Sequence, residues 1–507
     1  MAGAAPGQNR GIITVCVMMA TIMQALDTTI ATVALPYMQG SLSATQDQIN
    51  WVLTSYIVAA AITTPVTGFL AARFGRQRLF LAAVAGFTGA SVLCGIAGSL
   101  EQMVLFRLLQ GIFGAPLVPM SQSVLLDSYP KERHGSAMAM WGVGVMVGPI
   151  LGPTLGGWLT ESYNWRFVFY VNVPVGILTF LGLSAFLSES RISKLPFDWI
   201  GFATMSLFIG ALQMMLDRGE QMDWFSSTEI GLEAALAGLS LYLFLVHTAT
   251  SERPFIDPKM FKDRNFSIGL FFIFVVGIIL LATLALLTPY LQDLMGYPVV
   301  TAGLVLAPRG IGTMIAMMIV GRVINRVDPR SLIIFGLLLT AFALYEMAGF
   351  TPDVSQGVLV RTGIVQGLGL GFIFVPLSTI TFATLMPEFR TQGTAMFSLV
   401  RNIGSSIGIS LVIFLLGHNT QVMHAELVEH ITPFNDALQA GSASRIWDLT
   451  TAAGRVALNA EITRQATIIA YNDDFKLMMI VALAALPLVL LLRRAKTQGN
   501  AAEAILD

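Results

Sequence analysis

Residues 18–36, MMATIMQALDTTIATVALP, carry a single charged side chain, the carboxylate of Asp27. A charge inside a membrane-spanning segment is costly, and such residues usually face an ion path or a proton relay. Asp27 lies eight residues before Leu35, where the apolar stretch ends, which places it about 12 Å below the outer surface of a bilayer. The chemistry that this carboxylate offers is reversible binding of a proton. The alternative is structural: Asp27 caps or pairs with a group near the interface.

Arg107 matches Asp27 in depth and opposes it in charge. It lies five residues into an apolar stretch that begins near residue 102 and enters from the outside, hence about 8 Å deep. The two side chains can therefore meet directly or through a water molecule. A nearby arginine stabilises an ionised carboxylate, whereas loss of the arginine or exclusion of water favours the protonated form. Alternating exposure to two compartments would then load and unload a proton.

Four further charges fall within apolar stretches: Arg309, Glu346, Arg361 and Arg401. Arg309 and Arg361 lie in the outer halves of their stretches, and Glu346 is close enough in depth to pair with Arg361. Arg401 lies seven residues into its stretch, counted from the cytoplasmic side. For each of them, pairing between helices explains the charge at least as well as contact with a substrate.

Polar and adaptable side chains in the apolar stretches could line a substrate cavity. The candidates, besides Asp27, are Gln24, Tyr56, Gln110, Gln122 and Met146. Methionine adapts to ligands of varied shape. With 25 methionines in the chain, however, it is also ordinary filler in apolar helices.

The stretch GVGVMVGPILGPTLGGW, residues 142–158, combines small residues with two prolines. Glycine gives a helix a smooth face for close contact with another helix, and proline removes a backbone donor and bends the helix. The residues concerned are Gly142, Gly144, Gly148, Gly152, Gly156 and Gly157, with Pro149 and Pro153. They predict a tight packing face, a kinked helix at a moving and leak-proof interface, or both.

Two short basic turns resemble each other across the chain. GFLAARFGR (68–76) and GRVINRVDPR (321–330) each place an arginine five residues after a glycine, and the first contains Gly68, Arg73, Gly75 and Arg76. Arg107 with Gln110 and Gly111 likewise resembles Arg361 with Gln366 and Gly367, at an offset near 254 residues. Internal repeats of this kind are typical of secondary transporters, which bind substrate between the two repeats.

The composition predicts the elements that must hold these residues. The 507-residue chain is 55% hydrophobic and only 12% charged, with a mean hydropathy of +0.72, whereas soluble chains carry about 25% charge. It contains fourteen apolar stretches long enough to cross a bilayer, and in lipid each must be a helix. Most of the 29 lysines and arginines fall in alternate connections, which predicts that both termini are cytoplasmic.

The expected architecture is an all-α membrane protein of two six-helix halves with two inserted helices. The first half covers 11–188, the inserted pair 198–248, and the second half 266–492. A long outer segment, 418–473, precedes the last span, and amphipathic helices are predicted near 434–448 and 453–470. This segment is either a docking surface for a partner or a lid over the outer mouth.

Several functions are excluded or disfavoured. A net charge of −1 offers no basic face for nucleic acid. No G-x-x-x-x-G-K-[ST] sequence predicts ATP binding, and no zinc spacing or Ser/His/Asp arrangement predicts a metal or an enzyme. Cys16 and Cys94 lie in apolar stretches and are expected to be free thiols. The first span is expected to be retained, since no cleavage site follows it. No cofactor is expected, because the energy would come from the proton gradient.

Ordered motifs give the chain a resemblance to a known family. LDTTIATVALP, GFLAARFGRQR, RLLQGIFGA, GPILGPTLGG and WRFVFYVNVPVG resemble those of the major facilitator superfamily. LQMMLDRGEQMDWFSS (212–227) and the outer segment resemble the fourteen-span drug:proton antiporters of the QacA/EmrB type, and the likeness covers nearly the whole chain.

The resemblance implies a pump of the Gram-negative inner membrane that exchanges protons for hydrophobic toxic compounds. EmrB-like members work with an EmrA-like periplasmic adaptor and a TolC-like outer-membrane channel. Asp27 takes the acidic position of the first motif and Arg107 the basic position of the fourth span. The glycines of 148–157 with Pro149 take the antiporter motif, and Gly68, Arg73, Gly75 and Arg76 the gating loop.

Two residues depart from the family pattern. Ala72 replaces the aspartate that usually lies in the gating loop, so the charge relay of that loop differs here. Thr32 replaces the usual asparagine of the first motif, so a hydrogen bond there differs as well.

The function expected from these observations is proton-coupled export of amphipathic toxic compounds, with a cavity between the halves. The first alternative is an exporter dedicated to one metabolite, such as a fatty acid or a siderophore. The second is a sensor or scaffold without transport, which the paired intramembrane charges and the repeat disfavour.

Overall fold

A computed structural model describes residues 10–189, 197–252, 254–432 and 446–493. Within these ranges the regular secondary structure is helical, and no strand occurs. Fourteen helical segments are long and apolar enough to cross a membrane, which confirms the number expected from the sequence. A helix satisfies its own backbone hydrogen bonds, so it is the structure that apolar segments adopt in lipid.

The first six spans comprise ten helices, because three spans are divided and a short helix, α2, follows α1. Proline accounts for two of the divisions: Pro65 lies in the 3₁₀ turn between α3 and α4, and Pro116 lies between α6 and α7. The helices are α1 (Arg10–Ser41), α2 (Gln46–Ile49), α3 (Trp51–Thr63), α4 (Thr67–Phe74), α5 (Arg76–Ile96), α6 (Leu100–Gly114), α7 (Leu117–Ser128), α8 (His134–Ser162), α9 (Phe167–Tyr170) and α10 (Asn172–Phe186).

The remaining spans are mostly single helices. They are α11 (Trp199–Arg218), α12 (Thr228–Thr250), α13 (Arg264–Pro289), α14 (Val299–Val323), α15 (Pro329–Met347), α16 (Gln356–Ala383), α17 (Arg390–Glu429) and α20 (Ala452–Ala484). A π-helical turn, η5 (Tyr290–Leu294), extends α13, and a 3₁₀ turn, η7 (Pro487–Leu491), follows α20.

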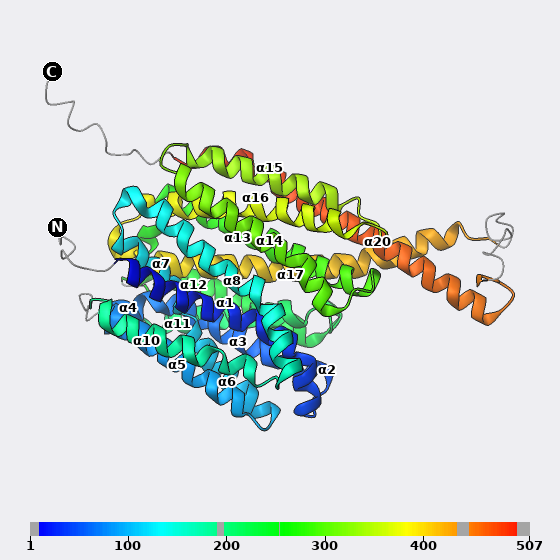
Figure 1. Cartoon of the computed structure of the whole chain (residues 1–507). Helices are drawn as coiled ribbons and strands as arrows, with labels where there is room; N and C mark the ends of the chain where they lie inside the picture. Colours follow the sequence, from blue (N-terminus) through cyan, green and yellow to red (C-terminus); the bar gives the residue numbers. More distant parts are fainter. Residues whose placement is uncertain (1–9, 190–196, 253, 433–445, 494–507) are drawn as a thin grey trace, which may run out of the picture.

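The two halves repeat the same helix packing. In the first half, α1 packs against α8, α6 against α3 and α5, and α5 against α10. In the second half, α13 packs against α17, α16 against α14 and α15, and α15 against α20. These pairs join the same positions in the order of spans in each half, so the repeat seen in the short motifs extends to the tertiary structure. The start of α1 and the end of η7, the first and last described elements, lie at the same end of the bundle, the predicted cytoplasmic end (Figure 1).

The inserted pair packs on the side of the two halves. α11 contacts α3 of the first half and α17 of the second, whereas α12 packs mainly on α11. Asp198 caps α11 and also accepts hydrogen bonds from the His247 ring of α12 and from the Phe255 N–H. Burial alone would raise the pKa of the Asp198 carboxyl, but hydrogen bonds from Gly201, Phe255 and His247 hold it below its ordinary value.

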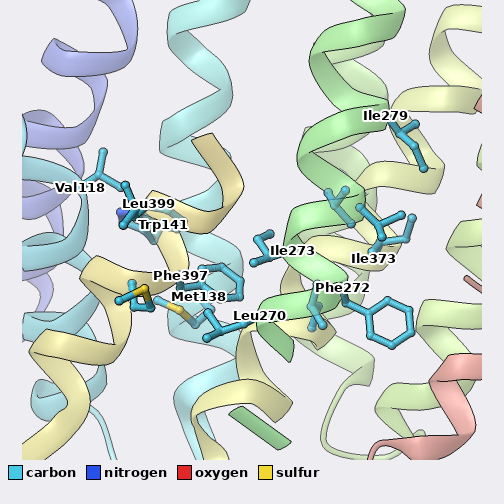
Figure 2. Packing of buried hydrophobic residues seen from close by; sticks show 14 of the residues in the cluster. Val118, Met138, Trp141, Leu270, Phe272, Ile273, Ile279, Ile373, Phe397 and Leu399 are labelled. Carbon is cyan, nitrogen blue, oxygen red and sulfur yellow. The ribbon is translucent and has the colours of Figure 1, made fainter. Parts of the chain in front are cut away.

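Apolar side chains from both halves form one continuous core. Figure 2 shows Val118, Met138 and Trp141 of the first half in the same cluster as Phe397 and Leu399 of α17. Closer to the predicted cytoplasmic end, Ser123 and Thr391 share a hydrogen bond of 2.8 Å, and Thr394 donates to the Pro119 carbonyl. The halves are therefore joined at this end by polar contacts as well as by the core.

The last two spans are longer than predicted. The stretches expected at 394–417 and 475–492 belong to α17, which continues to Glu429, and to α20, which begins at Ala452. Much of 418–473 is thus an extension of these two helices that projects from the outer end (Figure 1). The helix predicted near 453–470 is part of α20. The one predicted near 434–448 lies mostly outside the described residues.

Candidate functional site

Asp27 lies in the middle of α1 and is completely buried. Its carboxylate accepts hydrogen bonds from three side chains. Arg107 donates to Oδ2 at 2.7 Å, while Gln110 and Asn172 donate to Oδ1 at 2.8 and 2.9 Å. The donors come from α6 and α10, so the site forms only when three helices of the first half pack together. Asp27 and Arg107, paired in the sequence analysis by depth alone, are in direct contact.

Arg107 is held on several sides. It is 0% exposed, its Nε donates to the Val52 carbonyl at 3.0 Å, and its Nη1 also donates to Gln110 Oε1 at 2.6 Å. The guanidinium carbon lies 4.3 Å from the ring centroid of Tyr56 and 5.7 Å from that of Phe169. A planar guanidinium suits this combination of hydrogen bonding and stacking better than the point charge of lysine.

A layer of neutral polar groups surrounds the ion pair. Ser91 Oγ accepts hydrogen bonds from Gln110 at 2.7 Å and from Asn172 at 3.3 Å. These amides therefore link the carboxylate of Asp27 to α5. One arginine balances one aspartate here, and additional hydrogen bonds lower the cost of burying such a pair. Both Asp27 oxygens have donors, whereas Nη2 of Arg107 has no hydrogen-bond partner among the described residues. Any movement of α1 away from α6 would separate the two charges.

The predicted cavity residues lie in three different settings. Gln24 is partly exposed and donates to the Tyr56 hydroxyl at 3.2 Å, so both adjoin the ion pair. Gln110 belongs to the polar layer around Asp27. Gln122 is fully buried in α7, and both ends of its amide lack a hydrogen-bond partner among the described residues. Met146 packs on an apolar cluster between α8 and the second half.

The glycines of α8 face two directions. A Cβ on Gly148 would lie 2.5 Å from the Ala25 backbone and one on Gly156 2.8 Å from Ile30, and one on Gly152 would overlap Thr29. This row lets α1 approach α8 closely next to Asp27. Gly142 instead faces α14, where a Cβ would lie 2.6 Å from the Met317 sulfur.

Other members of the α8 motif make fewer close contacts. A Cβ on Gly144 would lie 3.2 Å from Met18, and one on Gly157 would meet nothing within 4 Å. Pro149 is exposed, and Pro153 lies in the same helix. α8 thus lies between α1 and the second half, as an interface helix must.

The gating-loop residues lie at the predicted cytoplasmic end. Gly68 approaches α17 so closely that a Cβ would lie 2.8 Å from the Gln392 Cα. Gly75 ends α4 with φ +91°, a backbone conformation that favours glycine. Arg73 is exposed in the last turn of α4, and Arg76 begins α5.

An aspartate that the sequence analysis did not single out joins the loop to the second half. Asp127, near the end of α7, pairs with Arg76 through one oxygen and with Arg390 of α17 at 2.6 Å through the other. Ala72 leaves the loop without its usual acid, and Asp127 bridges the two halves next to it. Thr32, the second departure, donates to the Thr28 carbonyl of its own helix at 3.1 Å.

The secondary charges fall into two groups. Arg361 forms an ion pair with Glu346, as their depths suggested, and Thr362 donates to the other Glu346 oxygen at 3.0 Å. Arg309 is 7% exposed and donates to the Leu280 carbonyl at 3.0 Å. Arg401 contacts the amide of Asn402 at 3.4 Å. No acidic partner is found for Arg309 or Arg401 within the described ranges.

Asn172 is the functional residue most clearly missed from the sequence. It lies in WRFVFYVNVPVG, where one amide among apolar residues was a usable signal, but nothing local indicated that it reaches Asp27. Cys16 and Cys94 are free and buried. No group of metal-ligating side chains occurs in the part of the chain that the structure describes.

Comparison with known proteins gives a consistent result. The family model described as Major Facilitator Superfamily matches residues 17–409. The multidrug export protein EmrB of Escherichia coli (strain K12) is 37% identical over 95% of each chain. The fatty acid resistance protein FarB of Neisseria gonorrhoeae is 37% identical over 94% of this chain and 95% of its own. The solved human organic anion transporter MFSD10 (TETRAN) shares the fold, with a TM-score of 0.59 at 14% identity over 94% of this chain and 99% of its own.

Proposed function

The chain belongs to the Major Facilitator Superfamily, in its EmrB-type branch of drug antiporters, and we propose that it exports amphipathic toxic compounds in exchange for protons. It is a multi-pass membrane protein of bacterial type and a transporter rather than an enzyme. The proton coupling, the inner membrane as its location and the partners below are proposals.

The observation that carries the proposal is the buried ion pair of Asp27 and Arg107. In the packed first half the carboxylate has three donors, and a donor that is itself charged favours the ionised form. If α1 and α6 separate, the carboxylate loses the arginine, and protonation offsets the cost of leaving it unpaired. A proton bound in one conformation and released in the other couples the gradient to transport.

The close packing of α1 on α8 links this chemistry to movement of the halves. Gly148, Gly152 and Gly156 hold α1 against α8, and the opposite side of α8 contacts α14 of the second half. A change in how α8 rests on α14 therefore acts directly on the helix that carries Asp27. Transporters of this kind alternate by moving one repeat against the other.

The outer hairpin of α17 and α20 supports a proposal about partners. Its two helices project beyond the outer end of the bundle (Figure 1). We propose that they dock an EmrA-like adaptor, which would connect the pump to a TolC-like outer-membrane channel. The competing role is a lid over the outer mouth. Deletion of the projecting part followed by adaptor pull-down separates them, since retained binding would exclude docking.

A second candidate function is export of one class of metabolite. The similarity to FarB, a fatty acid resistance protein, favours fatty acids over other metabolites. Arg309 and Arg401, which lack acidic partners among the described residues, are also consistent with a carboxylate-bearing substrate. The breadth of compounds against which the protein protects a pump-deleted strain distinguishes the two functions.

The direct test of proton coupling uses purified protein in liposomes with an imposed pH gradient. We expect the wild type to move a fluorescent cationic dye or a weak-acid uncoupler while the gradient lasts, and Asp27→Asn to lose this movement. Glu346→Gln is the matched control, because it removes the same charge from the other intramembrane ion pair. Asp27→Glu retains the acid and serves if Asp27→Asn does not fold.

Two results would contradict the proposal. Gradient-driven transport that persists in Asp27→Asn would remove Asp27 from the coupling. Transport by the wild type that is indifferent to the pH gradient would remove proton coupling altogether. If neither probe moves, fatty acids are the next substrates to test.

A further inference from the structure

Asp474 is a second buried carboxylate, and it lies in the second half. It is 1% exposed in α20, and neither of its oxygens has a hydrogen-bond partner among the described residues. Asp27, by contrast, has three donors. Burial of an ionised carboxylate without a partner is so costly that the group takes up a proton instead. These surroundings therefore favour the neutral carboxylic acid form of Asp474.

Two tyrosines lie in the same region of α20 and η5 as Asp474. Tyr471 precedes Asp474 by three residues on α20, a spacing that places both on one face of the helix. The Tyr471 ring meets the Tyr290 ring of η5 edge to face, with 5.3 Å between centroids. The Tyr290 hydroxyl is buried and, like the Asp474 oxygens, has no partner in the described part of the chain.

No basic group neutralises Asp474 from its own helix or from η5. The neighbouring Asp473 is bound by Lys476, with 2.9 Å between Oδ1 and Nζ. Asp293 of η5 is exposed and adds negative charge. The basic side chain closest in sequence is thus committed to the adjacent aspartate.

On the helices packed against α20, no described cation pairs with Asp474: of the arginines of α17, Arg390 pairs with Asp127 and Arg401 contacts the amide of Asn402. On α15 the acidic Glu346 is paired with Arg361. On the outer part of α17, His424 contacts Asn459 at 3.1 Å, and His418 stacks on Phe414.

The cytoplasmic-end cations of these helices are distant along the chain. The charged residue of α13, Arg264, begins that helix and donates to the Leu491 carbonyl at the other end of the bundle, and Arg330 lies in the first turn of α15. Protonation is the remaining way to neutralise Asp474 within the described residues.

The position of Asp474 along α20 places it near the outer compartment. It lies about 15 Å before the end of α20 at Ala484, and η7 continues to Leu491. The residues from Ala484 to Leu491 add about 14 Å at the rise of a 3₁₀ helix. Asp474 is therefore about 30 Å from the predicted cytoplasmic end, a distance that matches the thickness of the hydrocarbon core.

We propose that Asp474 is a second proton-binding site, which takes its proton from the outer compartment and works apart from the Asp27–Arg107 pair. A proton passes from water to a carboxylate oxygen, and the neutral acid stays buried beside Tyr471. It returns to water when α20 moves against α15 and α17 and the carboxyl becomes hydrated. The role of this proton in transport rests on the proposed function, whereas the binding of the proton to Asp474 does not.

Infrared difference spectroscopy of the purified full-length protein, between acidic and alkaline buffer, tests the binding. We expect the carboxylic acid C=O band of a buried group in the wild type and in Asp27→Asn, and its loss in Asp474→Asn. Asp473→Asn is the matched control: the same change one residue away, at a partly exposed and paired aspartate, should leave the band in place. A band that survives in Asp474→Asn overturns the proposal.

A second measurement tests the role in coupling. The number of protons moved per substrate in liposomes should fall in Asp474→Asn and stay at the wild-type value in Asp473→Asn. An unchanged ratio in Asp474→Asn overturns the coupling role. If the wild type moves no protons with substrate, the proposed function fails, while the infrared band still decides whether Asp474 binds a proton. Asp474→Glu, which shifts the band and keeps the acid, serves if the asparagine variant does not fold.

Discussion

The two halves share their helix packing but differ in how they treat interior charge. In the first half, one carboxylate and one arginine neutralise each other, and neutral amides satisfy them further. The offset of 254 residues that relates Arg107 to Arg361 also relates Asp27 to Leu281, so the second half has no acid at the corresponding place. Its buried Arg309 donates to the Leu280 carbonyl instead.

This difference shows that the repeat conserves helix packing and leaves the chemistry free to diverge. Close contact between helices depends on small residues and shape, which both halves supply. Neutralising a buried charge depends on one side chain at one position. A single substitution is therefore enough to make the two halves differ in their buried charges. The first half therefore carries the fully buried ion pair, and the fully buried acid described in the second half, Asp474, lies near its outer end without a basic partner in the described ranges.

The largest effect should come from breaking the ion pair of the first half. Arg107→Leu leaves Asp27 buried without its cation, which we expect to lower stability by about 3–5 kcal/mol. Arg361→Leu breaks an ion pair whose arginine side chain is 62% exposed. We expect this change to lower stability by about 1 kcal/mol or less. Thermal unfolding of the purified variants measures both. Equal losses would show that the two pairs are equivalent and the contrast between the halves is wrong.

A second prediction concerns the packing that the halves share. A Cβ on Gly148 would clash with the Ala25 backbone of α1, and one on Gly404 with the Phe274 backbone of α13. We expect Gly148→Ala and Gly404→Ala to destabilise the protein by similar amounts, about 1–3 kcal/mol. Gly157→Ala, which meets nothing within 4 Å, is the control. A large effect in one half only would contradict the shared packing.

A third prediction concerns the contact between the halves. Asp127→Asn removes the charge that links Arg76 to Arg390. For partly exposed ion pairs, the interaction free energy lost is about 1 kcal/mol. That energy corresponds to a roughly five-fold shift of a two-state equilibrium toward separation of the halves at this end. Distances between spin labels on α7 and α17 report it. Glu189→Gln is the control, because Glu189 pairs with Arg78 within the first half. A similar change in the α7–α17 distances in Glu189→Gln would show that Asp127 does not specifically hold the halves together.

The smallest expected effect also has the opposite sign. Arg309→Gln removes a buried charge that lacks an acidic partner in the described residues and donates to the Leu280 carbonyl. We expect stability to stay the same or to rise by up to about 1 kcal/mol. Arg107→Gln, the same change in the first half, should destabilise. A clear loss of stability in Arg309→Gln would indicate a partner for this arginine in another conformation.

Much of the fold followed from the sequence because lipid imposes simple rules. The number of spans and the repeat came from the lengths of apolar stretches and from short motifs, and the structure bears both out. The lengths of the last two helices were underestimated, because polar residues after 417 suggested the end of a span where α17 continues into water.

For the candidate site, the sequence determined which charges lie in the membrane and at what depth. Only the tertiary structure decided their partners, because the donors to Asp27 come from residues 80 to 145 positions away on other helices. Asp473 and Asp474 show the same limit: they are adjacent and chemically identical, yet Asp473 is partly exposed and paired, whereas Asp474 is buried without a partner in the described chain. A helix turns about 100° per residue, so its packing, and not its composition, decides which aspartate meets water.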